Sequence, residues 1–333
     1  MNKKKNTVIL VLFFSALLVI AVAPLVGMKL TPLEAVFDPA GSGIEGEIFW
    51  KLRVPRVAVS FLAGAALAIS GMVFQAIFRN SLATPFTMGV SSGAALGAAA
   101  YIRFGLPVAV FGIPGTSVSA FGGALMSILL VYGITRARKG FSIATMLLAG
   151  VAVSFFFSSL NLFTQYISDF TQTFRIIRWL MGGIAVAGFD SFWRILPFVA
   201  IGTAFVLYLT NELNLFTTGE EIAATRGVDV VKVRRILFFA TSLMVGGVVA
   251  VAGPIGFVGM MSPHICRIFV GPDHRYLTPA TILFGGIFLT LSDTLARTVI
   301  APAEIPVGVI TALLGGPFFI WLLLGGSTEK GIL

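Results

Sequence analysis

Apolar runs of about 20 residues recur along this chain, and they leave few folds open to it. A helix needs roughly 20 consecutive apolar residues to cross the hydrocarbon core of a bilayer. Of the 333 residues, 57% are hydrophobic and only 11% are charged, whereas about a quarter of a soluble domain is charged. The sequence therefore predicts an all-α membrane protein.

The runs divide the chain into ten predicted transmembrane helices within one polytopic domain, residues 1–333. The segments at 88–104 and 261–270 are short and contain Gly or Pro, so we expect helices half buried in protein. The first segment follows Lys3, Lys4 and Lys5 like a signal peptide, but its length indicates a retained span. The ten predicted segments are 7–28, 56–79, 88–104, 115–135, 142–167, 192–210, 232–252, 261–270, 278–300 and 306–325.

The distribution of positive residues predicts the orientation. With the N-terminus in the cytoplasm, ten alternating spans leave fourteen of the 23 Lys and Arg residues inside. This bias predicts cytoplasmic N- and C-termini. It also accounts for the net charge of +9 without nucleic acid as a partner. Arg53, Arg56 and Arg297 lie outside against the bias, so we expect something outside to require them.

Two glycine patterns concern helix packing. Gly89, Gly93 and Gly97 recur every four residues, and small residues on one face let helix backbones approach closely. We interpret them as structural packing residues. Residues 64–71 and 246–253 share the spacing Gly-x6-Gly inside spans that run in opposite directions. This weak inverted repeat is typical of transporters.

The longest polar stretch on the cytoplasmic side covers residues 211–235. Thr218 and Glu221 have the spacing of a capping box, and Gly227 can end a short helix in a left-handed conformation. Two interpretations stay open. The stretch could be a linker between two halves, or a docking helix whose small face, Ala223 and Ala224, enters a partner.

Asp293 and Arg297 lie four residues apart near the outer end of a span. They could form an ion pair along the helix. Alternatively, Arg297 could be free to meet an acidic partner outside, with Glu304 as a competitor for it. Charged residues within a membrane are functional by default, which favours a mixed role.

The sequence contains no energy source of its own. It has no Gly-x4-Gly-Lys-Ser/Thr phosphate loop and no series of intramembrane Asp, Glu and His residues for a proton relay. One cysteine and two histidines predict no metal site and no catalytic residues. A ten-span transporter with neither of these must take its energy source from a partner. The rival hypotheses are a secondary transporter, for which only Asp293 is a candidate, and a structural membrane protein without a pathway.

Ordered motifs between residues 45 and 325 resemble the FecCD-type permeases of bacterial type II ABC importers, which carry iron–siderophore complexes, haem or cobalamin. These motifs are Leu-Arg-Val-Pro-Arg at 52–56, Gly-Ala-Ala-Leu-Ala-Ile-Ser-Gly at 64–71, Arg-Asn-Ser-Leu-Ala-Thr-Pro at 79–85, Gly-Val-Ser-Ser-Gly-Ala at 89–94, Leu-Leu-Ala-Gly-Val-Ala at 147–152, Trp-Leu-Met-Gly-Gly at 179–183, Gly-Glu-Glu-Ile-Ala-Ala-Thr-Arg-Gly at 219–227, Gly-Pro-Ile-Gly-Phe-Val-Gly-Met-Met-Ser-Pro-His at 253–264 and Ala-Glu-Ile-Pro-Val-Gly at 303–308.

The resemblance implies a ten-helix permease fold, a homodimer around the pathway, two cytoplasmic ABC ATPases and an external substrate-binding protein. ATP and Mg²⁺ would be used by the ATPases, and this chain would bind no cofactor. Arg53, Arg56 and Arg297 match arginines that meet glutamates of the binding protein, and Ser142 and Ile143 match the cytoplasmic gate. The loop at about 211–231 matches the coupling helix that contacts the ATPase, with Gly219, Glu220, Glu221, Ala223, Ala224, Arg226 and Gly227.

The resemblance also implies import across a bacterial or archaeal cell (inner) membrane. We expect the substrate to be a ferric chelate, either a siderophore complex or haem. A cobalamin permease of the same family is the alternative.

Overall fold

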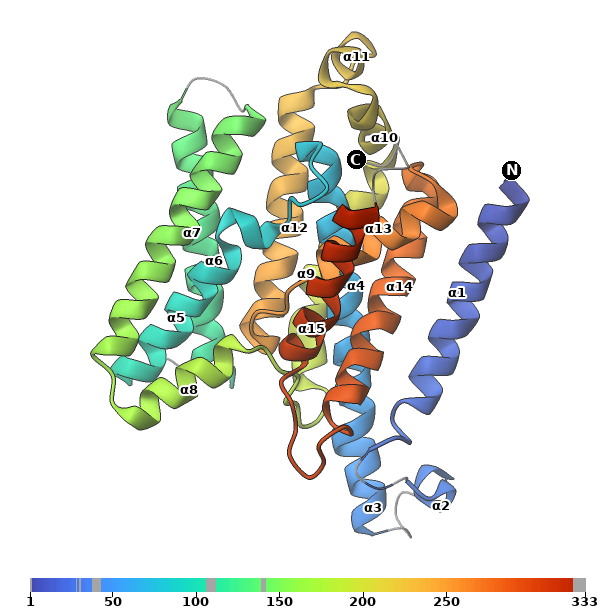
Figure 1. Cartoon of the computed structure of the whole chain (residues 1–333), viewed down its shortest axis with the longest axis vertical. Helices are drawn as coiled ribbons and strands as arrows, with labels where there is room; N and C mark the ends of the chain where they lie inside the picture. Colours follow the sequence, from blue (N-terminus) through green and yellow to red (C-terminus); the bar gives the residue numbers. More distant parts are fainter. Residues whose placement is uncertain are drawn as a thin grey trace. The chain divides into compact units, whose positions relative to one another are not determined.

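The computed structural model of the chain describes residues 2–27, 29, 31–37, 43–105, 112–138 and 142–325 (Figure 1). Within these residues the chain forms helices and connecting segments, without a β-strand. The elements are α1 Asn2–Val22, α2 Leu33–Phe37, α3 Ile44–Glu47, the π-helix η1 Ile48–Arg53, α4 Val54–Phe78, the 3-10 helix η2 Pro85–Met88, α5 Val90–Phe104, α6 Gly115–Ala137, α7 Ile143–Tyr166, α8 Phe170–Leu180, α9 Asp190–Tyr208, α10 Thr210–Thr218, α11 Glu220–Thr225, α12 Val230–Ala252, α13 Val258–Val270, α14 His274–Ala296 and α15 Val307–Gly325.

Each of the ten predicted segments corresponds to a helix, so the all-α membrane fold is confirmed. Among the described residues, seven helical stretches are long and apolar enough to cross a membrane. The other three helices, α5, α13 and α15, have 15, 13 and 19 residues. The C-terminus, which the sequence predicts to be cytoplasmic, lies outside the described residues, because these end at residue 325.

The hydropathy pattern missed α8. Its N-cap Asp169 accepts a hydrogen bond from the backbone nitrogen of Gln172 at 2.8 Å, and the Gln172 side chain accepts one from the Asp169 nitrogen, which completes a capping box. One face buries Ile176, while Phe170 and Arg175 are exposed. Because polar residues interrupt the apolar ones along the sequence of this 11-residue helix, it has no continuous apolar run, which is why the prediction of spans did not include it.

Contacts divide the chain into two compact units, Met1–Met72 with Gly183–Val199 and Gly256–Leu333, and Val73–Gly182 with Ala200–Ile255. In the second unit α5, α6 and α7 contact one another pairwise, and in the first unit α13, α14 and α15 do the same. A long helix precedes each trio, α4 in one case and α12 in the other. This recurring order agrees with the internal repeat predicted from the glycine spacing.

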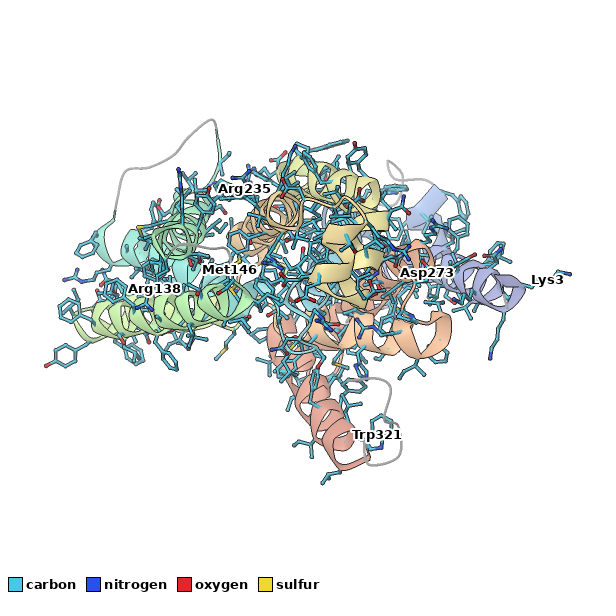
Figure 2. All side chains as sticks on the ribbon, turned by 90° about the horizontal axis from the view of Figure 1, so that it is seen from above. Lys3, Arg138, Met146, Arg235, Asp273 and Trp321 are labelled. Carbon is cyan, nitrogen blue, oxygen red and sulfur yellow. The ribbon has the colours of Figure 1, made fainter. Side chains whose placement is uncertain are left out.

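Large apolar side chains are exposed along several helices. Trp321 on α15 is 65% exposed, and Leu18 on α1 and Phe155 on α7 are exposed to a similar degree (Figure 2). A water-soluble monomer rarely exposes so much contiguous apolar surface. These faces are suited to contact lipid chains or another apolar protein surface.

Candidate functional site

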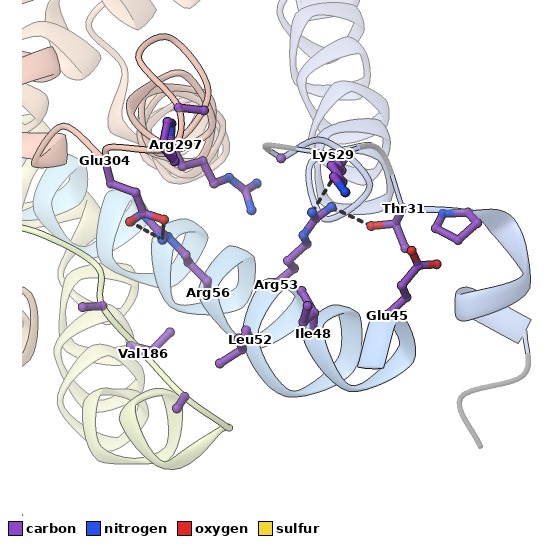
Figure 3. Close-up of a pocket in the computed structure, with 16 residues that line it drawn as sticks. Lys29, Thr31, Glu45, Ile48, Leu52, Arg53, Arg56, Val186, Arg297 and Glu304 are labelled. Carbon is purple, nitrogen blue, oxygen red and sulfur yellow. Dashed lines mark hydrogen bonds and ion pairs between the residues drawn. The ribbon is translucent and has the colours of Figure 1, made fainter. Parts of the chain in front are cut away.

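Three arginines that lie far apart in the sequence line one pocket of the first unit, with a volume of about 720 Å³ (Figure 3). Arg53 ends η1, Arg56 lies in the first turn of α4, and Arg297 is the C-cap of α14. Four basic side chains line the pocket, with Lys29 as the fourth, against the two acidic residues Glu45 and Glu304. The fold thus brings together the three residues that the resemblance assigns to a docking partner, in a positively charged site.

Arg56 joins two carboxylates. Its Nε donates to both Asp293 carboxylate oxygens, at 3.1 and 2.9 Å, and its Nη2 donates to Asp293 Oδ1 at 2.9 Å. On its other side Nη1 donates to the two Glu304 oxygens at 3.1 and 2.9 Å. The Asp293 side chain is 1% exposed, whereas that of Glu304 is 52% exposed. Arg56 is therefore held by a buried anion and a surface anion.

The expected ion pair between Asp293 and Arg297 is not the one that forms. Asp293 pairs with Arg56, which comes from a different helix. Between Asp293 and Arg297 the structure gives a backbone hydrogen bond of 3.2 Å, from the Arg297 nitrogen to the Asp293 carbonyl. The Arg297 guanidinium turns instead to the residue that follows α1, where Nη2 donates to the Ala23 carbonyl oxygen at 2.6 Å, and Nη2 also donates to Thr294 Oγ1 at 3.2 Å. Helix spacing alone cannot reveal this, because the competing partner is supplied by packing.

Glu304 is also reassigned. The sequence suggested that it competes for Arg297, but within the described residues its carboxylate pairs with Arg56. It lies in the connection between α14 and α15. Arg297 itself is buried, and its Nε has no hydrogen-bond partner within the described part of the chain. A buried charged donor without an acceptor is costly, so Arg297 is held here at the expense of stability.

Arg53 serves the chain's own backbone. It donates to the carbonyl oxygens of Pro24, Leu25 and Lys29 at 3.3, 3.2 and 2.8 Å, and to Thr31 Oγ1 at 2.6 Å (Figure 3). These carbonyls lie in the segment that follows α1, and the Leu25 carbonyl also accepts from the Thr31 nitrogen at 3.1 Å. The structure therefore gives Arg53 a positioning role for the segment after α1.

A second candidate site is the short helix α11, which the sequence predicted in the polar stretch. The predicted capping box is wrong. Thr218 is the last residue of α10, and its hydroxyl donates to the Leu215 carbonyl at 2.8 Å. Gly219 is the N-cap, with φ of 124° and no side-chain cap. Thr218 does not cap α11 because it belongs to α10, which leaves the N-cap position to Gly219.

Glu220 and Arg234 connect α11 to α12. Glu220 Oε1 lies 2.5 Å from Arg234 Nη2, and the Arg234 side chain is almost completely buried. The guanidinium also lies over the ring of Phe216 on α10, 5.9 Å from its centroid. Sequence analysis missed Arg234 as a site residue, because nothing in the sequence distinguishes it from the other basic residues of the same segment. Its pairing makes Glu220 a residue that fixes α11.

The two alanines that form the small face of α11 differ in exposure. Ala223 is 0% exposed, so it packs within the chain and cannot enter a partner's cleft in this arrangement. Ala224 is exposed, together with Glu221 and Arg226. Gly227 has φ of 84°, the left-handed stop that the sequence predicted. The exposed surface available for docking therefore centres on Ala224.

The residues assigned to the gate lie at the start of α7. Ser142 is the N-cap, and its Oγ accepts a hydrogen bond from the Thr145 nitrogen at 3.2 Å. Ser142 is exposed and Ile143 is half-buried. The structure thus gives Ser142 a capping role, and it leaves the gating role of both residues a prediction.

The glycines at 89, 93 and 97 have two different roles. Gly93 and Gly97 lie on α5, where a Cβ would collide with the carbonyl oxygens of Gly123 and Ser119 on α6. Gly89 precedes the helix in the left-handed region, with φ of 82°, and lies beside Ser127. The predicted single helical face therefore contains two of the three glycines, since the helix begins only at Val90.

Among the described residues, no group of three His, Cys, Asp or Glu side chains is placed to hold a metal ion.

Comparisons with known proteins relate nearly the whole chain to one transport family. The FecCD transport family matches residues 8–325. The chain is 34% identical over 334 residues to the iron(3+)-hydroxamate import system permease protein FhuG of Bacillus subtilis (strain 168), an alignment that covers 97% of this chain and 99% of that protein. It is 42% identical over 272 residues to the cobalamin import system permease protein BtuC of Halobacterium salinarum, covering 82% and 72%.

A solved structure extends the likeness to the fold. It describes an inward-facing conformation of a metal-chelate type ABC transporter, and it matches with a TM-score of 0.86 and 30% identity. The match covers 96% of this chain and 99% of that chain.

Proposed function

The chain belongs to the FecCD transport family, and from this premise we propose that it is the membrane-spanning permease of an ATP-driven importer that carries a ferric chelate, a siderophore complex or haem, into the cytoplasm. The family is one of transport permeases, so the chain is a transport subunit and not an enzyme. One relative that aligns over nearly the full length of both chains is an iron(3+)-hydroxamate permease, which favours the ferric chelate.

The observation that carries the proposal is the convergence of Arg53, Arg56 and Arg297 on one pocket. Guanidinium groups bind carboxylates with two parallel hydrogen bonds, and they are common at protein interfaces. A substrate-binding protein with acidic side chains on its surface would complement this pocket. A homodimer would present two such pockets, one for each lobe of the binding protein.

The energy source in this proposal is a pair of ABC ATPases at the cytoplasmic face. The exposed side of α11 around Ala224 supplies the contact, and the ion pair of Glu220 with Arg234 keeps this helix in place. ATP and Mg²⁺ act in the ATPases, so this chain needs no cofactor. The docked ATPases close on ATP, move α11 and open the pathway through the gate near Ser142 and Ile143.

The orientation is part of the same proposal. Both termini and α11 face the cytoplasm of a bacterial or archaeal cell, and the arginine pocket faces outside. The excess of Lys and Arg in the predicted cytoplasmic loops supports this orientation.

Reconstitution in lipid vesicles tests the proposal. The chain is combined with candidate ATPases and with binding proteins loaded with ferric hydroxamate, haem or cobalamin, and uptake of each is measured. We expect ATP-dependent uptake of a ferric chelate. ATP-dependent uptake of cobalamin alone would support the alternative substrate, which the 42% identical relative favours. Uptake driven by an ion gradient without an ATPase would overturn the proposal.

A further inference from the structure

We infer that Glu304 occupies Arg56 only until a carboxylate of the substrate-binding protein displaces it on docking. Asp293 stays bound to the same arginine throughout. Arg53 does not contact the binding protein. The inference rests on the proposed function and deepens it. It assigns different tasks to three arginines that the sequence treats alike, and it adds an acidic residue to the site.

The two carboxylates hold Arg56 in different ways. Asp293 accepts from two nitrogens, Nε and Nη2, on one edge of the guanidinium. Glu304 accepts from the single nitrogen Nη1, whose donation is shared between its two oxygens. Paired parallel bonds are the stronger arrangement. The contact with Asp293 is therefore the one that persists when another carboxylate approaches.

The burial of the two carboxylates supports the same assignment. The Asp293 side chain is almost completely enclosed, so its loss from Arg56 would leave a buried charge without a partner. Glu304 is about half exposed and lies in a connecting segment, so water can solvate it once it leaves. Surface ion pairs contribute little to stability. An acidic side chain from outside can replace Glu304 at small cost.

Arg297 supplies the second contact. Its guanidinium extends into the pocket between Arg56 and Arg53 (Figure 3), and its hydrogen bonds, to the Ala23 carbonyl and the Thr294 hydroxyl, are made by the single nitrogen Nη2. Arg53, by contrast, already donates to four oxygen atoms of the segment that follows α1. A partner carboxylate is thus met by Arg56 and Arg297, and Arg53 only shapes the pocket.

The first test needs no partner. Phenylglyoxal modifies accessible arginine side chains, and the labelling of Arg56 is quantified by mass spectrometry of peptides from the folded chain in detergent. We expect Glu304→Gln to raise the labelling rate of Arg56 several-fold. Glu45→Gln is the matched control, because it removes one charge from the same pocket without a contact to Arg56. Equal labelling in the two variants would overturn the inference.

The second test measures the dissociation constant of the complete transporter for its binding protein. We expect Glu304→Gln to tighten binding by about two- to fivefold, the range of a lost surface ion pair, and Glu45→Gln to change it less. If Glu304 instead orients Arg56 for docking, Glu304→Gln weakens binding and the inference is wrong. Absence of a complex with the unmodified chain would refute the proposed function, and the displacement with it, whatever the labelling result.

Discussion

Glu220 at the start of α11 and Arg234 in the second turn of α12 form an ion pair, with 2.5 Å between Oε1 and Nη2. The pair joins the short helix α11 to a buried position on the long helix α12. In the proposed function α11 contacts an ATPase and must transmit force to the membrane helices. This ion pair would be a direct connection between the two.

The ion pair predicts that Glu220→Gln loosens α11. We expect a loss of about 1–2 kcal/mol, below the usual cost of breaking a buried pair because Glu220 is 40% exposed. Thermal unfolding in detergent measures it. Glu221→Gln is the control, since Glu221 is exposed and adjacent. Equal melting temperatures of the two variants would show that the pair does not stabilise the helix.

The different exposure of the two alanines on α11 predicts that one substitution affects association with the ATPase and the other affects thermal stability. Ala224→Trp adds bulk on the exposed surface, so we expect unchanged thermal stability but weaker association with the ATPase. Ala223→Leu adds bulk at a buried position and is expected to lower stability by about 1–3 kcal/mol. Co-purification with the ATPase is the measurement. Normal association of the Ala224→Trp variant would argue against α11 as the docking helix.

Replacing Gly227 is expected to act through backbone strain alone. Its φ is 84°, and no atom lies within 4 Å of the position of a Cβ. We expect Gly227→Ala to cost about 1–2 kcal/mol and to reduce the coupling of ATP hydrolysis to uptake, because an L-residue is strained in this conformation. Gly227→Asn is expected to be milder, since Asn tolerates the left-handed region. Equal effects of Ala and Asn would indicate a side-chain clash with the partner.

Helix packing in the first unit predicts a strong effect at Gly71. A Cβ there would overlap the carbonyl group of Gly259 on α13, which is backbone and cannot move aside. We expect Gly71→Ala to destabilise the protein by at least about 1–3 kcal/mol. Gly133→Ala on α6, where nothing lies within 4 Å, is the control. Thermal unfolding of both variants checks the difference.

The arginine pocket predicts different outcomes for two arginines. Arg297→Glu should weaken binding of the binding protein by at least about tenfold, as for lost interfacial charge pairs. Arg53→Met should lower thermal stability, since it removes hydrogen bonds to the segment after α1, with a smaller effect on binding. Arg56→Glu should do both, because it repels Asp293 and the partner. Unchanged uptake and complex formation in the Arg56→Glu and Arg297→Glu variants would contradict the docking role.

The sequence alone predicted the helices well because hydropathy acts locally. Each span is a continuous apolar run, and a bilayer requires about 20 such residues whatever the rest of the chain does. The same local logic identified Gly227 as a helix stop. It missed α8, a short amphipathic helix whose apolar residues are separated along the sequence by polar ones.

Tertiary structure decided the electrostatic partners. Sequence spacing predicted an ion pair between Asp293 and Arg297. Asp293 instead accepts hydrogen bonds from Arg56, 237 positions away, and Glu304 accepts from the same guanidinium. Sequence also grouped Ala223 with Ala224, and packing buried only the first. Helix formation depends on neighbours along the chain, whereas a charge takes whichever partner the packed helices bring within reach. The sequence therefore determined where this protein forms helices, and only the folded chain determined which charges are already paired and which are left for a partner.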